Sequence, residues 1–263
     1  MWPKRAAASL LLLALPVAAQ TRVVSLSPDV TEWLVALHAQ DLLVGRDALA
    51  RGRDVARVPV IGSSRALTAA PVLAARPDLV LGSSLAQPAS IFDQLTRLGV
   101  RVIAVPHADD PAAFASGMQQ IGRAVGKDEE GRRLAAAWLR GMQPHAASGR
   151  RVLLSYDGRL VAGSGTAGDA LIRAAGAVNA AAALKGLLPM APEAWVRAAP
   201  EVVIVAAHNL AALGGLAAFK ARPELSASPA VRQGRVYAWP AADFLRLGVQ
   251  SPAVAERLRR VLP

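Results

Sequence analysis

The sequence has 263 residues and no cysteine, and its 30 lysine and arginine residues outnumber its 19 aspartate and glutamate residues. The missing cysteine excludes disulfides, thiolate metal sites and a lipid anchor on an N-terminal cysteine. The arginines stand singly or in pairs rather than in basic runs interleaved with aromatic residues, which argues against a nucleic-acid-binding protein.

The start of the chain predicts an export signal. Lys4 and Arg5 precede an apolar run over residues 6–15, and Pro16 and small residues follow as far as Ala19. This is the layout of a secretory signal peptide that is cleaved after Ala19. The run is too short for a membrane span, which needs about 20 residues. We therefore expect a periplasmic protein whose net charge is +9 without the signal.

Short apolar strands alternate with helices in the first half of the chain. Continuous apolar strands of this kind are typical of a mainly parallel sheet that is covered by helices on both faces. The predicted strands are 23–26, 42–44, 58–61, 79–81 and 102–105, and the predicted helices include 30–37 and 91–98.

The middle of the chain, residues 111–146, has two helical segments and no strand pattern. In the second segment Leu134, Trp138 and Met142 recur every four residues and so share one helix face. Acidic residues begin this segment and Arg140 lies in its last turn, as the helix dipole favours.

The second helical segment predicts a stiff connection between two lobes. We expect a signal peptide at 1–19, an N-terminal lobe at 20–126, a connecting helix at 127–147 and a C-terminal lobe at 148–263. A flexible linker would be rich in Gly, Ser or Pro. The two lobes are therefore expected to move little relative to each other.

The second half of the chain repeats the pattern of the first. Residues 74–81 and 198–205 both run from a helix end through a proline and an acid into an apolar strand. We expect two similar α/β lobes and a cleft between them. The strands predicted for the second lobe are 152–156, 160–162, 202–205 and 236–239.

These segments resemble the substrate-binding proteins of ABC importers for metal chelates, in which a single long helix joins two α/β lobes. The resemblance rests on residues 22–32, 43–45, 59–62 and 76–80. Residues 64–68 and 165–180 are most similar to the haem-binding branch of that family. The resemblance implies a monomer that captures haem, performs no chemistry and needs no catalytic cofactor. It also implies delivery to an ABC permease of the inner membrane. Cobalamin and ferric siderophores are the alternative cargoes.

The candidate ligand contacts are residues that directly follow predicted strands, where ligands of open α/β sheets bind. Haem also needs an axial ligand to iron and cations for its propionates. The resemblance suggests Arg65 as the propionate partner, but the tyrosine that haem-binding relatives commonly carry just before it is replaced by Ser63 and Ser64. A second tyrosine is missing near Leu188. The predicted contacts are Asp29, Arg46, Ser63, Ser64, Arg65, Ser84, Tyr156, Asp243 and Phe244, and the axial candidates are His208 and His107, with Tyr156 in reserve.

The glycine-rich residues 163–168 match a dinucleotide-binding fingerprint and keep a nucleotide-dependent enzyme as the rival class. That fingerprint needs a second strand ending in an acid about 20 residues on. Residues 184–192 contain two prolines and no strand pattern, so we expect a tight structural turn instead.

The resemblance also implies docking on the permease through one acid per lobe, seven residues before the proline of each repeated element. Glu193 fulfils this pattern in the second lobe, and Ala70 stands at the corresponding place in the first. An exposed acid in the first turn of a helix is also common without any partner.

Overall fold

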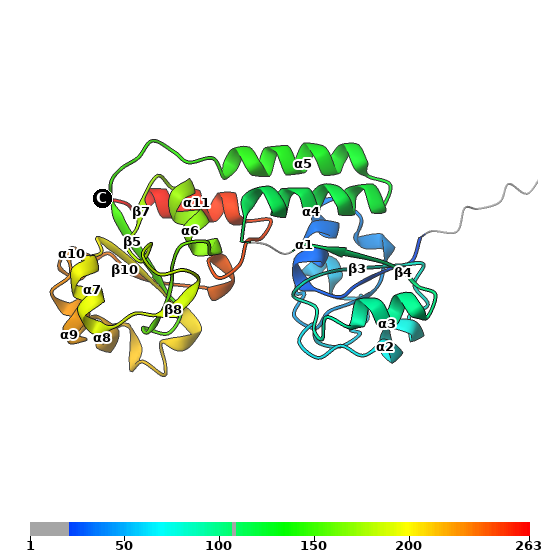
Figure 1. The fold of residues 1–263 in the computed structure, drawn as a ribbon, viewed down its shortest axis with the longest axis horizontal. Helices are drawn as coiled ribbons and strands as arrows, with labels where there is room; N and C mark the ends of the chain where they lie inside the picture. Colours follow the sequence, from blue (N-terminus) through cyan, green and yellow to red (C-terminus); the bar gives the residue numbers. More distant parts are fainter. Residues whose placement is uncertain (1–20, 107–108) are drawn as a thin grey trace, which may run out of the picture.

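Two α/β lobes lie side by side, and a pair of long helices lies above the first lobe and extends toward the second (Figure 1). The computed structural model describes residues 21–106 and 109–263, so the predicted signal peptide and His107 lie outside the described residues. The helices are α1 (Pro28–Ala36), α2 (Ala69–Ala74), α3 (Ile91–Arg97), α4 (Pro111–Ala124), α5 (Asp128–Gly141), α6 (Ala167–Ala174), α7 (Pro192–Ala198), α8 (Gly215–Lys220), α9 (Pro223–Ser226), α10 (Pro229–Arg232) and α11 (Ser251–Arg260), and the short 3-10 helices are η1 (Gln40–Leu42), η2 (Arg53–Val55), η3 (Ala207–Asn209) and η4 (Ala241–Asp243).

The first lobe is built on a fully parallel sheet in the order β2-β1-β3-β4. The apolar strands predicted here are confirmed, except that residues 58–61 contribute only a bridge between Val60 and Arg46. That segment has the composition of a strand but too few paired residues to form one. The strands are β1 (Val23–Ser25), β2 (Leu43–Arg46), β3 (Leu79–Ser83) and β4 (Arg101–Val105).

The second lobe holds a six-stranded mixed sheet, in which five strands follow the order β10-β9-β5-β6-β8 and the sixth, β7, pairs with β5 off this path. Strands β10, β9 and β5 are parallel, whereas β6 is antiparallel to both β5 and β8. The sequence pattern missed β7 and β8, and the prediction of no strand within 184–192 is wrong for β8. Its proline ends the strand, where a missing N–H costs little. The strands are β5 (Arg151–Ser155), β6 (Leu160–Ala162), β7 (Val178–Asn179), β8 (Leu187–Pro189), β9 (Val202–Ala206) and β10 (Val236–Trp239).

The internal repeat is confirmed at the level of hydrogen bonds. The N–H of Arg22 donates to the Asp78 carboxylate (2.8 Å), and the N–H of Asp78 donates to the Arg22 carbonyl (2.9 Å). In the second lobe, Arg151 and Glu201 make the same two bonds at 3.0 and 2.8 Å. Each pair joins the first strand of its lobe to the acid that precedes a central strand. The two lobes therefore share one construction.

The same two arginines also cap the helices that precede these strands. Arg22 donates to the carbonyls of Ala75 and Arg76, and Arg151 donates to the carbonyl of Ala198 (2.6 Å). A guanidinium at this place satisfies carbonyls that a helix end leaves unpaired.

The connection between the lobes runs through α4 and α5, which lie against each other (Figure 1). The helix predicted at 127–147 is observed as α5, which ends at Gly141, and residues 142–147 continue without helix or strand. Gly122 and Gly131 let the two backbones approach, since a Cβ on Gly122 would lie 2.8 Å from the Cα of Gly131. The family resemblance implied one connecting helix, whereas the structure has two, because α4 packs along the length of α5.

A continuous buried core extends from the first lobe through α4 and α5 into the second. Phe114 of α4 stacks on Trp138 of α5 with ring centroids 4.5 Å apart, and it meets Trp33 of α1 edge-on at 4.8 Å. Trp138 Nε1 donates to the carbonyl of Gly248 in the second lobe (2.9 Å). This chain of contacts supports the prediction that the lobes move little.

Within the described part of the chain, the helices are too short or too polar for any of them to traverse a lipid bilayer.

Candidate ligand-binding cleft

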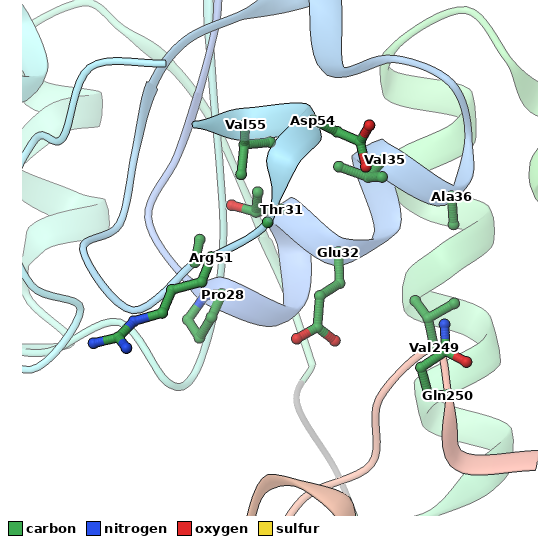
Figure 2. Close-up of a pocket in the computed structure, with 12 residues that line it drawn as sticks. Pro28, Thr31, Glu32, Val35, Ala36, Arg51, Asp54, Val55, Val249 and Gln250 are labelled. Carbon is green, nitrogen blue, oxygen red and sulfur yellow. The ribbon is translucent and has the colours of Figure 1, made fainter. Parts of the chain in front are cut away.

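A cavity of about 210 Å³ lies between the lobes. Its first-lobe wall is α1, from Pro28 to Ala36, together with the segment 50–55 after β2, and its second-lobe wall is Val249 and Gln250. Figure 2 shows Val249 and Gln250 across from α1, with the Arg51 side chain extending away from them. The lining is mainly apolar and carries a few charged groups, as is usual for small-molecule sites.

Two smaller cavities also have lining residues from both lobes. One of about 140 Å³ is lined by Glu32, Asp243 and Arg246 and shares Glu32 and Gln250 with the first cavity, and one of about 160 Å³ lies between Asp109 and the second-lobe residues Thr166, Leu187 and Leu245, among others. All three cavities thus lie where residues of the two lobes meet. The cleft predicted from the repeat is therefore present.

An ion pair crosses this interlobe space. Arg246 of the second lobe binds the carboxylate of Glu32 in α1 through two nitrogens, with Nη1 3.2 Å from Oε2 and Nη2 in contact with Oε1. Burial by itself lowers the pKa of Arg246, but the hydrogen bond and the charge of Glu32, helped by Asp29, raise it overall. The sequence analysis named neither Glu32 nor Arg246 as a site residue, because neither directly follows a strand.

Two of the predicted metal-ligating residues lie together in the second lobe. Tyr156 follows β5 and His208 follows the neighbouring parallel strand β9, so both side chains stand at the same sheet edge. The tyrosine hydroxyl lies 3.3 Å from His208 Nε2, and their ring centroids are 5.3 Å apart. The Asn209 side-chain amide donates to the Tyr156 carbonyl (2.7 Å) and so fixes the two loops to each other. His208 is exposed and Tyr156 is half-buried.

Three other predicted contacts are used to hold loops in shape. Asp29 is fully buried and accepts a hydrogen bond from the Ser83 hydroxyl (3.0 Å). Arg46 donates to the carbonyls of Val55 (2.8 Å) and Ala50 (2.6 Å), and Ser64 is buried with its N–H bound to the Asp47 carboxylate. Each of these residues therefore has a structural role in its loop, and its role as a ligand contact stays a prediction.

The remaining predicted contacts fall into two groups. Ser63, Arg65 and Ser84 are half-buried or exposed on first-lobe loops, where a ligand could reach them. Asp243 is paired with Arg257 (3.1 Å), and Phe244 is only 1% exposed and belongs to the core, although it borders the 160 Å³ cavity.

A family model described as a periplasmic binding protein matches residues 23–242. The chain belongs to this family. Solved structures similar to this periplasmic binding protein include the haem-binding protein BhuT in complex with two haems, with 33% identity and a TM-score of 0.80, covering 91% of this chain and 97% of that one. The haem-binding protein RhuT from Roseiflexus sp. RS-1, in its apo form, has 29% identity and a TM-score of 0.79, covering 92% of this chain and 97% of that one. The haem-binding protein HutB of Vibrio cholerae has 26% identity and a TM-score of 0.82, covering 92% of this chain and 99% of that one.

Curated relatives of this periplasmic binding protein include vitamin B12-binding proteins of Yersinia pestis and Yersinia pseudotuberculosis. The identity is 38% over 101 residues, which are 37% of this chain and 36% of the relatives. The chain thus spans about a third of the length of the curated relatives it matches. The names of these relatives and of the solved structures describe binding proteins rather than enzymes.

The glycine-rich loop of this periplasmic binding protein has the structural role that the sequence predicted. Gly163 leaves no room for a side chain, because its Cβ would lie 2.2 Å from the Leu184 carbonyl oxygen, and Gly165 has φ +76°. Thr166 caps α6 by accepting the N–H of Asp169 (3.2 Å). Of the two strands that follow α6, β7 is a two-residue strand that pairs in parallel with β5, and β8 pairs antiparallel with β6, whereas the dinucleotide fold needs a parallel partner for the strand before the glycine-rich loop.

The described residues contain no group of three or more His, Asp or Glu side chains that could hold a bare metal ion. His107, one of the two predicted axial ligands, lies outside the described residues.

Proposed function

We propose that this periplasmic binding protein captures haem in the cleft between its lobes and delivers it to an ABC permease. The observation that carries the proposal is the Tyr156–His208 pair at the carboxyl edge of the second sheet. The likeness to haem-binding proteins, with identities of 26 to 33% over more than nine-tenths of the chain, supports haem as the cargo.

The Tyr156–His208 pair has the chemistry that haem iron needs. Tyrosine and histidine are both axial haem ligands, and a hydrogen bond to a ligand fixes its orientation and tunes its basicity. In this pair, one side chain coordinates the iron while the other supplies the hydrogen bond. The pair therefore replaces the tyrosine that is absent at Ser63.

Haemin titration of the purified protein, followed by visible absorption, tests this function. The wild type is expected to give a shifted Soret band, which Tyr156→Phe abolishes and His208→Ala weakens about tenfold, the usual cost of a supporting metal-site partner. Tyr237→Phe is the matched control, because Tyr237 is the chain's other tyrosine and lies within β10.

His107→Ala completes this series for the second predicted axial ligand. If spectra are unchanged in Tyr156→Phe, His208→Ala and His107→Ala, none of these residues coordinates iron. A wild type that binds no haemin contradicts the proposed function itself.

Cobalamin is the second candidate cargo, and the match to vitamin B12-binding proteins favours it. Cobalamin brings its own axial ligands, so a site for it needs no tyrosine at Ser63. A cobalamin titration beside the haemin titration separates the two, and tighter binding of cobalamin would reverse our assignment.

For delivery, we propose that the second lobe docks through Glu193, and that the protein acts as a monomer in the periplasm. Glu193 is exposed in the first turn of α7, and Ala70 is exposed in α2. Each is the second residue of its helix, so the repeat supports equivalent places on the two lobes.

A further inference from the structure

The ion pair between Arg246 and Glu32 has the form of a bound carboxylate. Two guanidinium nitrogens face two carboxylate oxygens, which is the arrangement by which arginine recognises any carboxylate, whether it belongs to the protein or to a ligand. The two residues come from different lobes, α1 and the loop after η4. The Glu32 carboxylate therefore contacts Arg246 from the opposite wall of the interlobe space.

This ion pair lies on the walls of the cleft. Glu32 borders both the 210 Å³ and the 140 Å³ cavities, and Arg246 borders the smaller one. The Glu32 side chain is 36% exposed and that of Arg246 is 23% exposed, so a small anionic group can reach the arginine. The glycine at position 248 leaves space beside the ion pair, because a Cβ there would lie 3.2 Å from Glu32 Oε2 and 3.5 Å from Arg246 Nη1.

Among the described residues that line the 140 Å³ cavity, Arg246 is the one positively charged side chain. Asp243 borders the same cavity, but it is held by Arg257, whose guanidinium stacks on Trp239 at 3.5 Å from the ring centroid. The Asp243 carboxylate is therefore engaged outside the Arg246–Glu32 pair. Exchange of one carboxylate for another on Arg246 leaves that second pair intact.

We propose that Arg246 binds a carboxylate of the cargo, and that Glu32 occupies this position while the cleft is empty. The inference rests on the proposed function, because haem carries two propionate carboxylates and cobalamin carries amides in their place. A partly buried arginine is costly to leave unpaired. Glu32 holds it until the cargo arrives, and the displaced glutamate returns to water at little cost because it is partly exposed.

The exchange has a clear consequence for selectivity. A cargo without a carboxylate would have to leave the interlobe ion pair in place or break it without compensation. The cleft therefore favours a carboxylate-bearing tetrapyrrole over its uncharged analogues.

The experiment compares haemin with haemin dimethyl ester, in which both carboxylates are blocked. Arg246→Gln is expected to weaken haemin binding at least about tenfold, the usual scale for a hydrogen bond to a charged group, and to leave the affinity for the ester unchanged. Glu32→Gln is expected to strengthen haemin binding several-fold, because the competing carboxylate is gone. This gain must vanish when Arg246→Gln is added.

Arg150→Gln is the control, because Arg150 forms an arginine–glutamate ion pair with Glu201 (2.8 Å, through one nitrogen) within the second lobe and lines none of the three interlobe cavities. If Arg246→Gln fails to fold, as judged by its thermal melt, Arg246→Lys keeps the charge without the two-pronged geometry and is expected to give an intermediate loss for haemin alone.

Equal losses for haemin and its ester in the Arg246 variants, or weaker haemin binding in Glu32→Gln, would overturn the inference while the proposed function stands. A wild-type protein that binds neither haemin nor its ester would overturn both.

Discussion

At the scale of single residues, the glycines of the 163–168 loop are needed for different physical reasons. Gly163 faces the Leu184 carbonyl at a distance that a Cβ cannot tolerate, and Gly165 adopts a left-handed φ with open space around it. Gly168 lies against Ala162, where an added Cβ would be 2.7 Å from the Ala162 Cβ. A fingerprint that looks like a phosphate cradle is thus explained by packing and backbone conformation.

These reasons predict unequal costs for alanine at Gly163 and Gly165. Gly163→Ala forces backbone apart and is expected to cost about 3 kcal/mol of unfolding free energy, the upper end for overpacking. Gly165→Ala meets only the left-handed backbone penalty of about 1 kcal/mol. Thermal or urea unfolding of the two variants measures the difference, and equal losses of stability would show that the close approach at Leu184 is relieved cheaply.

The sequence could predict the position of some side chains of the candidate site but not of others. The rule that ligands contact residues after strands selected Tyr156 and His208, and the structure brings them together because parallel neighbouring strands end at the same sheet edge. The rule also selected Asp29 and Arg46, which hold their loops through hydrogen bonds within the protein, because a polar residue after a strand can serve either purpose. Arg246 carries no local signal, since its role depends on α1 of the other lobe.

At the scale of elements, hydrogen bonds from one arginine in each lobe hold together the repeated unit of helix, proline, acid and strand. In the second lobe, the Glu201 carboxylate accepts the N–H of Arg151 and is also paired with Arg150. The Arg151 N–H lowers the pKa of Glu201 against the opposing effect of burial, and Arg150 lowers it further. The carboxylate is therefore more acidic in the folded protein than its ordinary value of 4.5.

A lowered pKa in the folded state means that Glu201 stabilises the fold when it is ionised. Its contribution is fully present above pH 4.5 and is lost as the pH falls through the lower native value. Glu201→Gln is expected to cost about 1 kcal/mol at pH 7, and the gap to the wild type should narrow progressively as the pH falls below 4.5. Unfolding curves of both proteins from pH 7 to pH 3 check this, and a gap that stays constant would contradict it.

Elements were predicted best where packing on both sides demands apolar residues. The inner strands β3 and β9, every residue of which is buried, were found within two residues at either end, because continuous apolar runs there leave few alternatives. Strand β8 was missed because its exposed residues and its proline look like a loop, and only its pairing with β6 makes it a strand.

At the scale of the whole molecule, the two lobes share a construction but differ in the surface they would offer the proposed permease. The repeat places Ala70 and Glu193 at the same position of α2 and α7, yet only the second position carries a charge. The buried core through α4 and α5 holds the lobes as a pair. A partner that contacts both lobes would therefore meet two positions at a fixed distance from each other, the charged Glu193 and the uncharged Ala70.

This asymmetry predicts that delivery depends on the second lobe. Glu193→Ala should leave haemin affinity unchanged, because α7 lies outside the cleft, but should slow growth of the native bacterium on haemin as its iron source. An interface charge that is lost without replacement typically costs binding about tenfold or more. Ala70→Glu should restore part of the lost growth if both helices face the permease. Glu129→Ala is the matched control, since Glu129 is an exposed first-turn acid of α5. Normal growth of the Glu193→Ala strain would place docking elsewhere on the molecule.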